Sequence, residues 1–406
     1  MRLVYSLGIQ FYNFVVLIFS LFNKKAKDMI EGRKEVPKKS DSENEDLIWI
    51  HAASLGEFEQ GRPIIEQIKK DYPNKKILLS FFSPSGYNIM KDYAEVDEVC
   101  YIPFDTRKKA KQFIERKNPA LVIFIKYEFW FNFLIELNLK QIPVVFVSAI
   151  FREDQFFFKK RGNWFLNKLK KVDYFFVQND KSKIILENNG IQNCSIAGDT
   201  RFDAVITNSN SDYQNDLINE FLLGKKSIIF GSTWEEDQAL IVKLINSGKL
   251  GSKKIIIAPH EINSAKIEKL VETINIQVGR YSKKEVSSQV LIIDQIGILK
   301  YLYRFCDLAY IGGGFGVGIH NTLEAIVYKV PVIFGPNFKK FDEAINMINN
   351  GIGFYISNYE EFEAQIIAFQ KLDSQFDLTL KINKFITENK GAANVILEYL
   401  KKKKYL

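Results

Sequence analysis

Three short segments of the chain place a carboxylate three residues after a small polar side chain. They run from Ser54 to Glu57, from Thr233 to Glu236 and from Asn321 to Glu324. This spacing is typical of a capping box, in which both side chains satisfy the unpaired N–H groups that begin a helix. The same carboxylates could act as a general base or accept hydrogen bonds from a ligand, so both interpretations stay open.

A glycine run precedes the third segment, with five glycines in the seven residues from Gly312 to Gly318. Such a density is costly unless the backbone needs positive φ values or approaches a ligand closely. The run lies between an expected strand and an expected helix, and free N–H groups at a helix N-terminus bind anions. No Gly-Lys-Ser/Thr follows, which excludes a Walker A loop, and the run lies too late for an N-terminal dinucleotide fingerprint. Phosphate or nucleotide contact is favoured over a plain tight turn.

The rarer side chains lie near the same places. The three histidines, His51, His260 and His320, lie at or just beyond the ends of expected strands, where parallel sheets bind ligands. Arg201 lies just past another strand and could clamp an anion, or form a surface ion pair with a neighbouring aspartate. Glu128 follows an apolar strand among aromatic residues, so we expect its carboxylate to be partly desolvated.

Length and composition limit the function classes. The 406 residues are 47% apolar and 26% charged, which indicates a globular protein of two or three domains. Three cysteines lie far apart without a Cys-x-x-Cys spacing. With only three histidines, this argues against a disulfide framework, a cysteine zinc site and a multi-histidine metal site.

The net charge of +8 lies in the two tails. Residues 1–40 carry a net charge of +5 and residues 398–406 carry +3, while the chain between them holds 44 basic and 44 acidic side chains. A nucleic-acid binder would carry its basic patch on the folded body, so no nucleic-acid partner is expected. The basic tails indicate anionic membrane lipids instead.

The N-terminal segment supports a membrane. Residues 3–22 carry no charge, and three lysines follow them within five residues. About 20 apolar residues can span a bilayer, so residues 1–23 are expected to be an anchor that spans the membrane or lies at its surface. A buried amphipathic helix is the alternative. No small-residue cleavage site follows, which disfavours a signal peptide, and lysines after the segment would keep the body cytoplasmic.

Short apolar runs alternate with amphipathic segments from Leu47 onward, which predicts parallel sheets covered by helices on both faces. The fold class is therefore α/β, with two doubly wound domains in tandem. The expected strands are 47–51, 76–80, 121–125, 144–148, 174–178 and 195–198, then 227–231, 254–258, 290–294, 307–311 and 331–334. The expected divisions are an anchor (1–23), a basic linker (24–45), a first domain (46–206), a polar linker (207–216), a second domain (217–384), and a return helix with a basic tail (385–406).

Six motifs occur in a fixed order: His51 to Glu57, Tyr101 to Asp105, Tyr127 to Asn132, Gly198 to Asp203, Gly231 to Glu235 and Gly318 to Glu324. Together they resemble the 3-deoxy-D-manno-octulosonic acid (Kdo) transferases of lipopolysaccharide synthesis. The resemblance runs to about residue 346, and the ordered set is specific although no single motif is decisive. It implies a GT-B fold, in which two Rossmann-like domains face a cleft and the last helix crosses back to the first domain.

The resemblance also implies an activity. Such enzymes transfer Kdo from CMP-Kdo to a lipid A precursor at the inner membrane, with inversion and with no cofactor or required metal. By position, the general base falls on Glu57 and the second required carboxylate on Glu128. Further substrate contacts fall on Ser54, Gly56, Arg152 and Arg201. Nucleotide contacts fall on Ser232, Thr233, Pro259, His260, Gly313, Gly314, Phe315, Gly316, His320, Asn321 and Glu324, the last as the ribose partner.

The chain departs from the family pattern at two places. Where the family commonly has Pro-Arg-His-Pro-Glu-Arg, this chain has only residues 258–262, without an arginine. Where many members have Asn-Ala-Arg, it has residues 148–150, with Arg152 two positions later. Two cationic donor contacts are thus in doubt, and Arg152, Arg201 or a lysine could replace them.

Two other classes use the same features. A GT-B sugar-nucleotide epimerase or hydrolase would need no membrane segment, and a non-catalytic membrane-associated nucleotide-binding protein would tolerate loss of Glu57. The transferase interpretation predicts CMP-Kdo, a lipid A precursor and anionic inner-membrane lipids as partners. If the last helix returns to the first domain, both basic tails are expected on the same side of the molecule.

Overall fold

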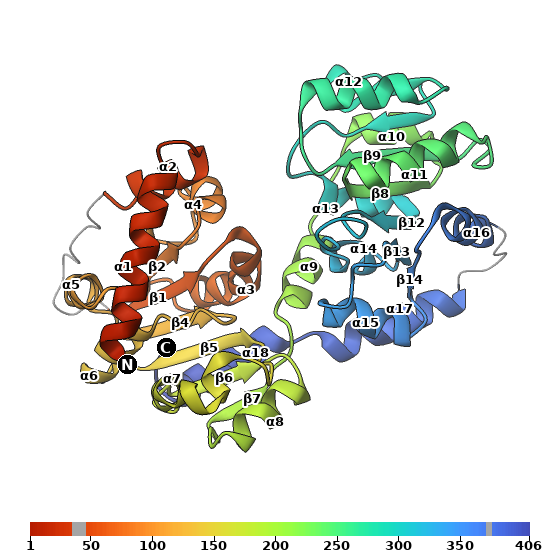
Figure 1. The fold of residues 1–406 in the computed structure, drawn as a ribbon. Helices are drawn as coiled ribbons and strands as arrows, with labels where there is room; N and C mark the ends of the chain where they lie inside the picture. The colour runs from red at the N-terminus through yellow and green to blue at the C-terminus, as the bar shows by residue number, and fades with distance from the viewer. Residues whose placement is uncertain (35–45, 371–375) are drawn as a thin grey trace. The chain divides into compact units, whose positions relative to one another are not determined.

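The alternating apolar runs form two separate parallel sheets, one in each of two units (Figure 1). The structure, a computed structural model, describes residues 1–34, 46–370 and 376–406. The first unit comprises Met1–Ala204 and Lys390–Leu406, and the second comprises Val205–Asn389. The expected α/β class with two doubly wound, Rossmann-like domains is confirmed.

The first unit contains a seven-stranded parallel sheet in the order β3-β2-β1-β4-β5-β6-β7. Its strands are β1 (Leu47–Ala52), β2 (Lys76–Phe81), β3 (Glu98–Tyr101), β4 (Leu121–Ile125), β5 (Val144–Ala149), β6 (Tyr174–Val177) and β7 (Cys194–Ile196). Its helices are α1 (Arg2–Phe19), α2 (Lys24–Glu31), α3 (Leu55–Asp71), α4 (Pro84–Met90), α5 (Arg107–Lys117), α6 (Phe131–Leu139), α7 (Asn163–Leu169), α8 (Asp180–Asn188) and α18 (Ala392–Lys402). Two 3₁₀ turns, Phe156–Phe158 and Lys160–Gly162, precede α7.

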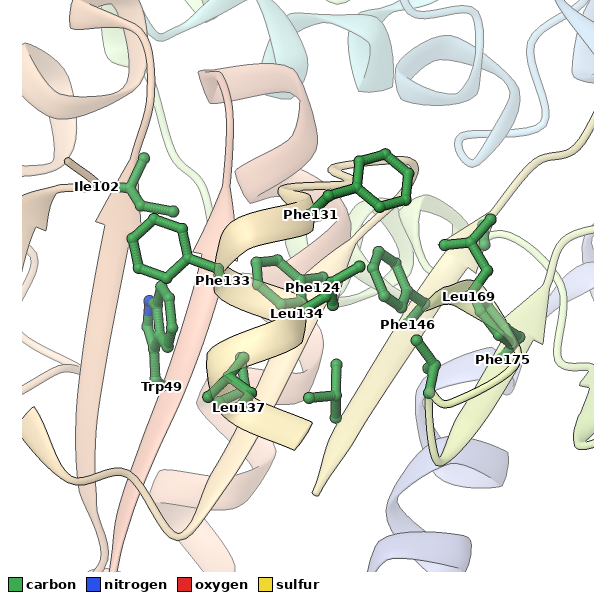
Figure 2. Packing of buried hydrophobic residues seen from close by; sticks show 14 of the residues in the cluster. Trp49, Ile102, Phe124, Phe131, Phe133, Leu134, Leu137, Phe146, Leu169 and Phe175 are labelled. Atoms are coloured by element: carbon green, nitrogen blue, oxygen red, sulfur yellow. The ribbon is translucent and has the colours of Figure 1, made fainter. Parts of the chain in front are cut away.

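Aromatic side chains on neighbouring strands build one face of this sheet. Phe124 on β4, Phe146 on β5 and Phe175 on β6 stack in a row, with ring centroids 5.2 and 5.3 Å apart. Figure 2 shows α6 lying over this row, with Phe133 and Leu137 among the side chains packed there. The other face is aliphatic and is covered by α3 and α18. Because both faces are buried, each central strand is a continuous apolar run, which is why the sequence revealed them.

Helix α1 lies along the body of the first unit (Figure 1), and one side of it is held there by polar contacts. The Tyr5 hydroxyl donates to Asp105 (2.5 Å), and the Arg2 guanidinium donates to Glu136 (2.6 Å). Further along, the Tyr12 ring stacks on Phe82, and Val16 is buried. The other side of the helix carries exposed apolar side chains: Leu3, Val4, Leu7, Phe11, Phe14, Leu17 and Phe19.

Residues 24–45, expected as a basic linker, begin with a helix. Helix α2 spans Lys24–Glu31, and the Asn23 side chain caps it by accepting from the Ala26 N–H. After α2, the Arg33 guanidinium donates to the carbonyls of Met29, Phe82 and Ile102, which attaches this segment to the body. The rest of the expected linker, residues 35–45, lies outside the described residues.

The second unit repeats the architecture with the strand order β10-β11-β9-β8-β12-β13-β14, all parallel. Its strands are β8 (Ser227–Thr233), β9 (Lys254–Pro259), β10 (Val278–Arg280), β11 (Val290–Ile292), β12 (Cys306–Ile311), β13 (Val332–Phe334) and β14 (Gly353–Tyr355). Its helices are α10 (Asp216–Leu222), α11 (Glu235–Asn246), α12 (Ser264–Thr273), α13 (Leu299–Leu302), α14 (Leu323–Ile326), α15 (Asp342–Asn349), α16 (Tyr359–Gln370) and α17 (Phe376–Asn389).

Helix α9 (Arg201–Ser209) carries the chain from the first unit to the second, since the boundary falls between Ala204 and Val205. The expected polar linker, residues 207–216, therefore begins inside α9 and ends at the first residue of α10. The chain returns between Asn389 and Lys390, where α18 joins the first unit as expected. The Asp203 carboxylate accepts from the N–H groups of Gly391 and Ala393, so it holds the start of α18 beside α9.

Helices α1 and α18 pack against different residue clusters of the first unit. Tyr5 of α1 packs against the face that contains Trp49, whereas Ile396 and Leu400 of α18 pack against the face that contains Ile48. Successive residues of a strand point to opposite faces, which separates the two helices. That both basic tails end on the same side of the molecule stays a prediction.

Candidate active site

Glu57 lies in the first turn of α3, directly after β1. Its carboxylate accepts from the N–H (2.9 Å) and the hydroxyl (3.2 Å) of Ser54, so the capping box expected from the sequence is present. The side chain is buried, with 8% of its surface exposed. Desolvation, followed by the nearby charge of Glu128, raises the pKa of Glu57 to about 6 against the opposing effects of Lys126 and Ser54. A capping carboxylate with a raised pKa can also take up a proton near neutral pH.

Glu128 lies in the turn that follows β4, and its side chain is 12% exposed. The turn begins with Lys126 in the left-handed region, at φ 68°, which is a strained conformation for a lysine. Because β1 and β4 are parallel neighbours, this turn and the start of α3 lie at the same edge of the sheet. The structure therefore brings the two expected carboxylates together.

Ser54 and Gly56 lie beside Glu57 at this edge. Gly56 is exposed, and a Cβ added there would meet no atom within 4 Å. Glycine in the first turn of a helix is costly relative to alanine, and here the protein itself does not require it. The open space leaves room for a substrate close to Glu57.

The two arginines that were expected to contact the substrate have different surroundings. Arg201 donates from Nε and Nη2 to Asp199, at 2.8 and 2.6 Å, and both side chains are largely buried. The alternative of an ion pair is therefore the one observed, although it is buried rather than at the surface. This pair lowers the pKa of Asp199 against the effect of its burial. Arg152 is exposed, and its backbone N–H binds the side chain of Gln155.

In the second unit, three rings form a stack at the ends of β8 and β9 and beside the glycine run. The Trp234 indole donates to Nε2 of His320 (2.9 Å), and these two rings are nearly coplanar, at 7°. The exposed ring of His260 lies against both, with centroids 4.6 Å from Trp234 and 4.2 Å from His320. Desolvation, and then the proximity of His260, lowers the pKa of His320 to about 4, so its ring is neutral and can accept from Trp234.

The second capping box is shifted by one residue from its expected position. Helix α11 is capped at Trp234, whose N–H donates to Asp237 (2.9 Å) rather than to Glu236. Asp237 also accepts from the Tyr310 hydroxyl (2.6 Å) and from the Gly313 N–H (2.8 Å), so it fixes the glycine run against β12. Sequence reasoning missed this buried aspartate because three consecutive acidic residues follow Trp234 and only their burial separates them.

The glycine run is folded largely upon itself. The N–H groups of Gly316 and Gly318 bind the carbonyl of Gly313, and the His320 N–H binds the carbonyl of Gly312. A Cβ at Gly312 would lie 2.3 Å from the Ser232 carbonyl oxygen, so part of the glycine requirement comes from packing. Helix α14 is only four residues long, and α11 begins with three carboxylates that oppose an anion. The expectation of a phosphate site built on these helix N-termini is therefore weakened.

The third segment pairs its two side chains directly. The Asn321 amide donates to Glu324 (3.1 Å) and its carbonyl accepts from the Leu323 N–H (3.1 Å). Between them, the Thr322 hydroxyl oxygen is buried and has no hydrogen-bond partner among the described residues. An unsatisfied buried hydroxyl is costly, so this position is suited to a ligand atom. Ser232, at φ 53°, and Thr233 precede the ring stack, and Pro259 lies beside it.

No group of three or more His, Cys, Asp or Glu side chains is placed to hold a metal ion within residues 1–34, 46–370 and 376–406. The three cysteines are buried and free.

Comparisons with known proteins agree with the motifs. Residues 28–204 match the family described as 3-deoxy-D-manno-octulosonic-acid transferase (kdotransferase). The 3-deoxy-D-manno-octulosonic acid transferase of Aquifex aeolicus is 27% identical over 337 residues, which cover 81% of this chain and 88% of that protein. A bifunctional glycosyltransferase/methyltransferase of Fusobacterium nucleatum is 28% identical over 369 residues, and this chain spans only 56% of its length.

The fold also has solved relatives. A UDP-GlcNAc 2-epimerase from Neisseria meningitidis, bound to UDP-GlcNAc, superposes with a TM-score of 0.62 at 14% identity, covering 88% of this chain and 100% of that one. At that identity the likeness shows the GT-B architecture alone. The ordered motifs, the family match over residues 28–204 and relatives that extend over most of the chain all make this protein similar to the Kdo transferases.

Proposed function

We propose that the chain is an inverting glycosyltransferase that moves Kdo from CMP-Kdo to a lipid A precursor. The observation that carries the proposal is Glu57, a buried carboxylate with a raised pKa and open space beside it. Similarity to the Kdo transferases suggests the sugar, and the Aquifex relative carries that activity in its name. The nucleotide donor and the lipid acceptor are part of the proposal.

The chemistry assigns one step to the first unit. Glu57 takes the proton of the attacking acceptor hydroxyl, the hydroxyl oxygen bonds to the anomeric carbon of Kdo, and CMP leaves with the electron pair of the broken bond. A pKa of about 6 leaves the carboxylate mostly ionised at pH 7 to 8 while making it a stronger base than an ordinary glutamate. Attack from the face opposite the leaving group inverts the anomeric centre.

The second unit is proposed to hold CMP. The exposed face of His260 offers a flat surface for a base, and Glu324 offers a contact for the ribose. The phosphate is proposed to contact the Ser232–Thr233 turn and the N–H groups of the glycine run that are not used internally. Transfer should continue in EDTA, because no step of this scheme uses a metal ion.

The localisation proposed is the inner membrane, with α1 in the plane of the bilayer surface. Helix α1 is long and apolar enough to cross a membrane, but Arg2, Tyr5 and Tyr12 bind one side of it to the body. A spanning position would detach those contacts and leave Asp105 and Glu136 without them. The exposed apolar side fits the interface between headgroups and acyl chains. Because α1 contacts segments that follow β2, β3 and β4, it lies at the sheet edge that also holds Glu57 and Glu128, where a lipid acceptor is needed.

Purified protein incubated with CMP-Kdo, with and without a lipid A precursor, tests the proposal. We expect CMP release that depends on the acceptor and a Kdo-modified lipid detected by mass spectrometry. CMP release without the acceptor would indicate a hydrolase, and conversion of the sugar nucleotide without release of CMP would indicate an epimerase. Nucleotide binding without turnover would indicate a non-catalytic protein.

A further inference from the structure

A chain of hydrogen bonds runs from the interior of the first unit to the turn that carries Glu128. The Trp49 indole donates to the Ser80 hydroxyl oxygen (2.7 Å), and Nδ1 of His51 lies 2.8 Å from the same oxygen. On its other side, Nε2 of His51 accepts from the Trp130 indole (3.1 Å). His51 is completely buried, so both ring nitrogens exchange water for these partners.

These hydrogen bonds define which nitrogen of the His51 ring carries the proton. The Trp130 indole can only donate, so Nε2 must offer its lone pair and the single proton of the neutral ring must lie on Nδ1. Nδ1 then donates to Ser80. Glu128 lies 3.8 Å from Nε2, beyond hydrogen-bond distance, and it is the carboxylate next to the ring among the described residues. The carboxylate is therefore near the ring without being bound to it.

We propose that His51 is a positioning residue that fixes the Glu128 turn through Trp130. The turn is also held by the Lys126 N–H, which donates to the Val147 carbonyl (2.8 Å), and by the Phe129 ring, which packs on Phe146 and Phe151; neither contact involves the Trp130 side chain. The turn starts from a strained backbone at Lys126. The Trp130 ring packs on the Phe82 ring, with centroids 4.8 Å apart, but this packing does not fix the position of one ring along the plane of the other. The hydrogen bond from Trp130 to His51 fixes that position, and it places Glu128 close enough to raise the pKa of Glu57. The sequence suggested His51 only as a histidine at a strand end.

The bond can be tested without any turnover, by NMR of the full-length chain with ¹⁵N-labelled tryptophan. The chain has four tryptophans and hence four indole N–H signals. Trp130→Phe identifies the signal of Trp130. His51→Phe keeps a ring but removes the acceptor, so this signal should move upfield, whereas His51→Gln offers an amide oxygen and should largely restore it. His320→Gln is a matched control, because it alters the acceptor of Trp234 and should leave the Trp130 signal in place.

The positioning role rests on the proposed transferase activity and needs a second measurement. His51→Phe should lower kcat by on the order of 10²-fold, the effect of a misplacement of about 1 Å at a reacting group, with little change in KM. Because Glu128 then no longer holds its place beside Glu57, the acid limb of the pH–rate profile should move to lower pH. The positive charge of Lys126 lowers the pKa of Glu57 and should shift the acid limb in the same direction. Trp130→Phe should move the limb the same way, and His51→Gln should restore both kcat and the limb.

The outcomes separate the two proposals. An unmoved Trp130 signal in His51→Phe would overturn the bond itself, whatever the enzyme does. A moved signal with unchanged kcat and an unchanged acid limb would overturn the positioning role. A lower kcat with no shift of the limb would also overturn it, because loss of folded protein produces that pattern. A wild-type protein without Kdo transfer would overturn the proposed function, and the NMR result would still decide the bond.

Discussion

Glu57 has two roles at one position, since it caps α3 and has the protonation behaviour of a general base. The capping donors from Ser54 favour its ionised form, but burial and the charge of Glu128 outweigh them. The pKa of a carboxyl group is a balance between its two protonation states, so a raised value means that the ionised form costs the folded protein free energy. A cap needed only for stability would not be buried against a second carboxylate.

Glu57→Gln is expected to reduce turnover and raise stability together. The ordinary pKa of glutamate is about 4.3, and the folded value is about 6. The cost of ionisation is therefore absent below about pH 4 and fully present above pH 6, where it reaches about 2 kcal/mol. The variant should be more stable by up to that amount at pH 8 and not at pH 4, while turnover falls roughly 10²–10⁴-fold.

Denaturant unfolding at the two pH values and a CMP-release assay measure these effects. Glu115→Gln, at an exposed position on α5, is the control and should change neither quantity by much. Near-normal turnover in Glu57→Gln would leave capping as the role of this residue.

Glu324→Ala tests the nucleotide site. Asn321 orients the Glu324 carboxylate, and we expect that carboxylate to accept from the ribose hydroxyls of CMP. Loss of hydrogen bonds to a charged group should weaken CMP binding by about 1.5–3 kcal/mol, measured by calorimetry. Glu236→Ala, at an exposed position on α11, should bind CMP as the wild type does. Equal affinities for both variants would contradict the assignment.

At the scale of elements, the central strands and one edge strand, β7, could be predicted, whereas the other three edge strands could not. All eleven expected strands are present, and burial on both faces gives most central strands a continuous apolar run. The three unexpected strands, β3, β10 and β14, lie at sheet edges and have three or four residues. Glu98, Gly279 and Gly353 interrupt their apolar pattern, so only pairing with a neighbouring strand defines them.

The site was predictable to the extent that its residues follow strands. Glu57 and Glu128 follow expected strands, and the resemblance assigned them their roles; the structure brings them to the same edge of the sheet. The partners of His51 could not be predicted, because Ser80 and Trp130 lie 29 and 79 positions away from it in sequence. Arg201 was expected either to clamp an anion or to pair with a neighbouring aspartate, and the structure shows the pair with Asp199.

Asp203 and α18 give a prediction at the element scale. Two N–H groups at the start of α18 depend on the Asp203 carboxylate, as at a helix N-cap. Asp203→Ala should destabilise this helix by about 1 kcal/mol, which hydrogen–deuterium exchange would show as faster exchange in residues 392–402. Asp212→Ala, at an exposed position after α9, should leave that exchange unchanged. Slow exchange in both variants would mean that packing alone holds α18.

At the scale of the whole molecule, the binding surface for lipid is expected on one face of the first unit. Leu7, Phe11 and Phe14 lie on the outer side of α1, with 55%, 69% and 58% of their surfaces exposed. Replacing all three with asparagine should abolish salt-resistant flotation with anionic liposomes, since burying each such side chain contributes about 1.5–3 kcal/mol. CMP binding by the second unit should not change.

Two controls define this result. Ile89→Asn removes an equally exposed apolar side chain from α4 and should leave flotation intact. Replacing Lys401–Lys404 with glutamine should also have little effect on salt-resistant flotation, because contacts between lysines and anionic headgroups are screened by salt. Loss of flotation in the lysine variant, whose α1 is unchanged, would show that the lipid contact depends on the lysines at the end of α18 rather than on α1.

The return of α18 to the first unit has a consequence for how the protein is made. The ribosome completes the whole second unit before it releases α18, so the aliphatic face beneath Ile396 and Leu400 stays uncovered throughout that time. The nascent first unit is thus an unfinished domain that a chaperone or a protease can recognise. A chain that ended at Asn389 would contain the complete second unit but would leave this face of the first sheet without α18.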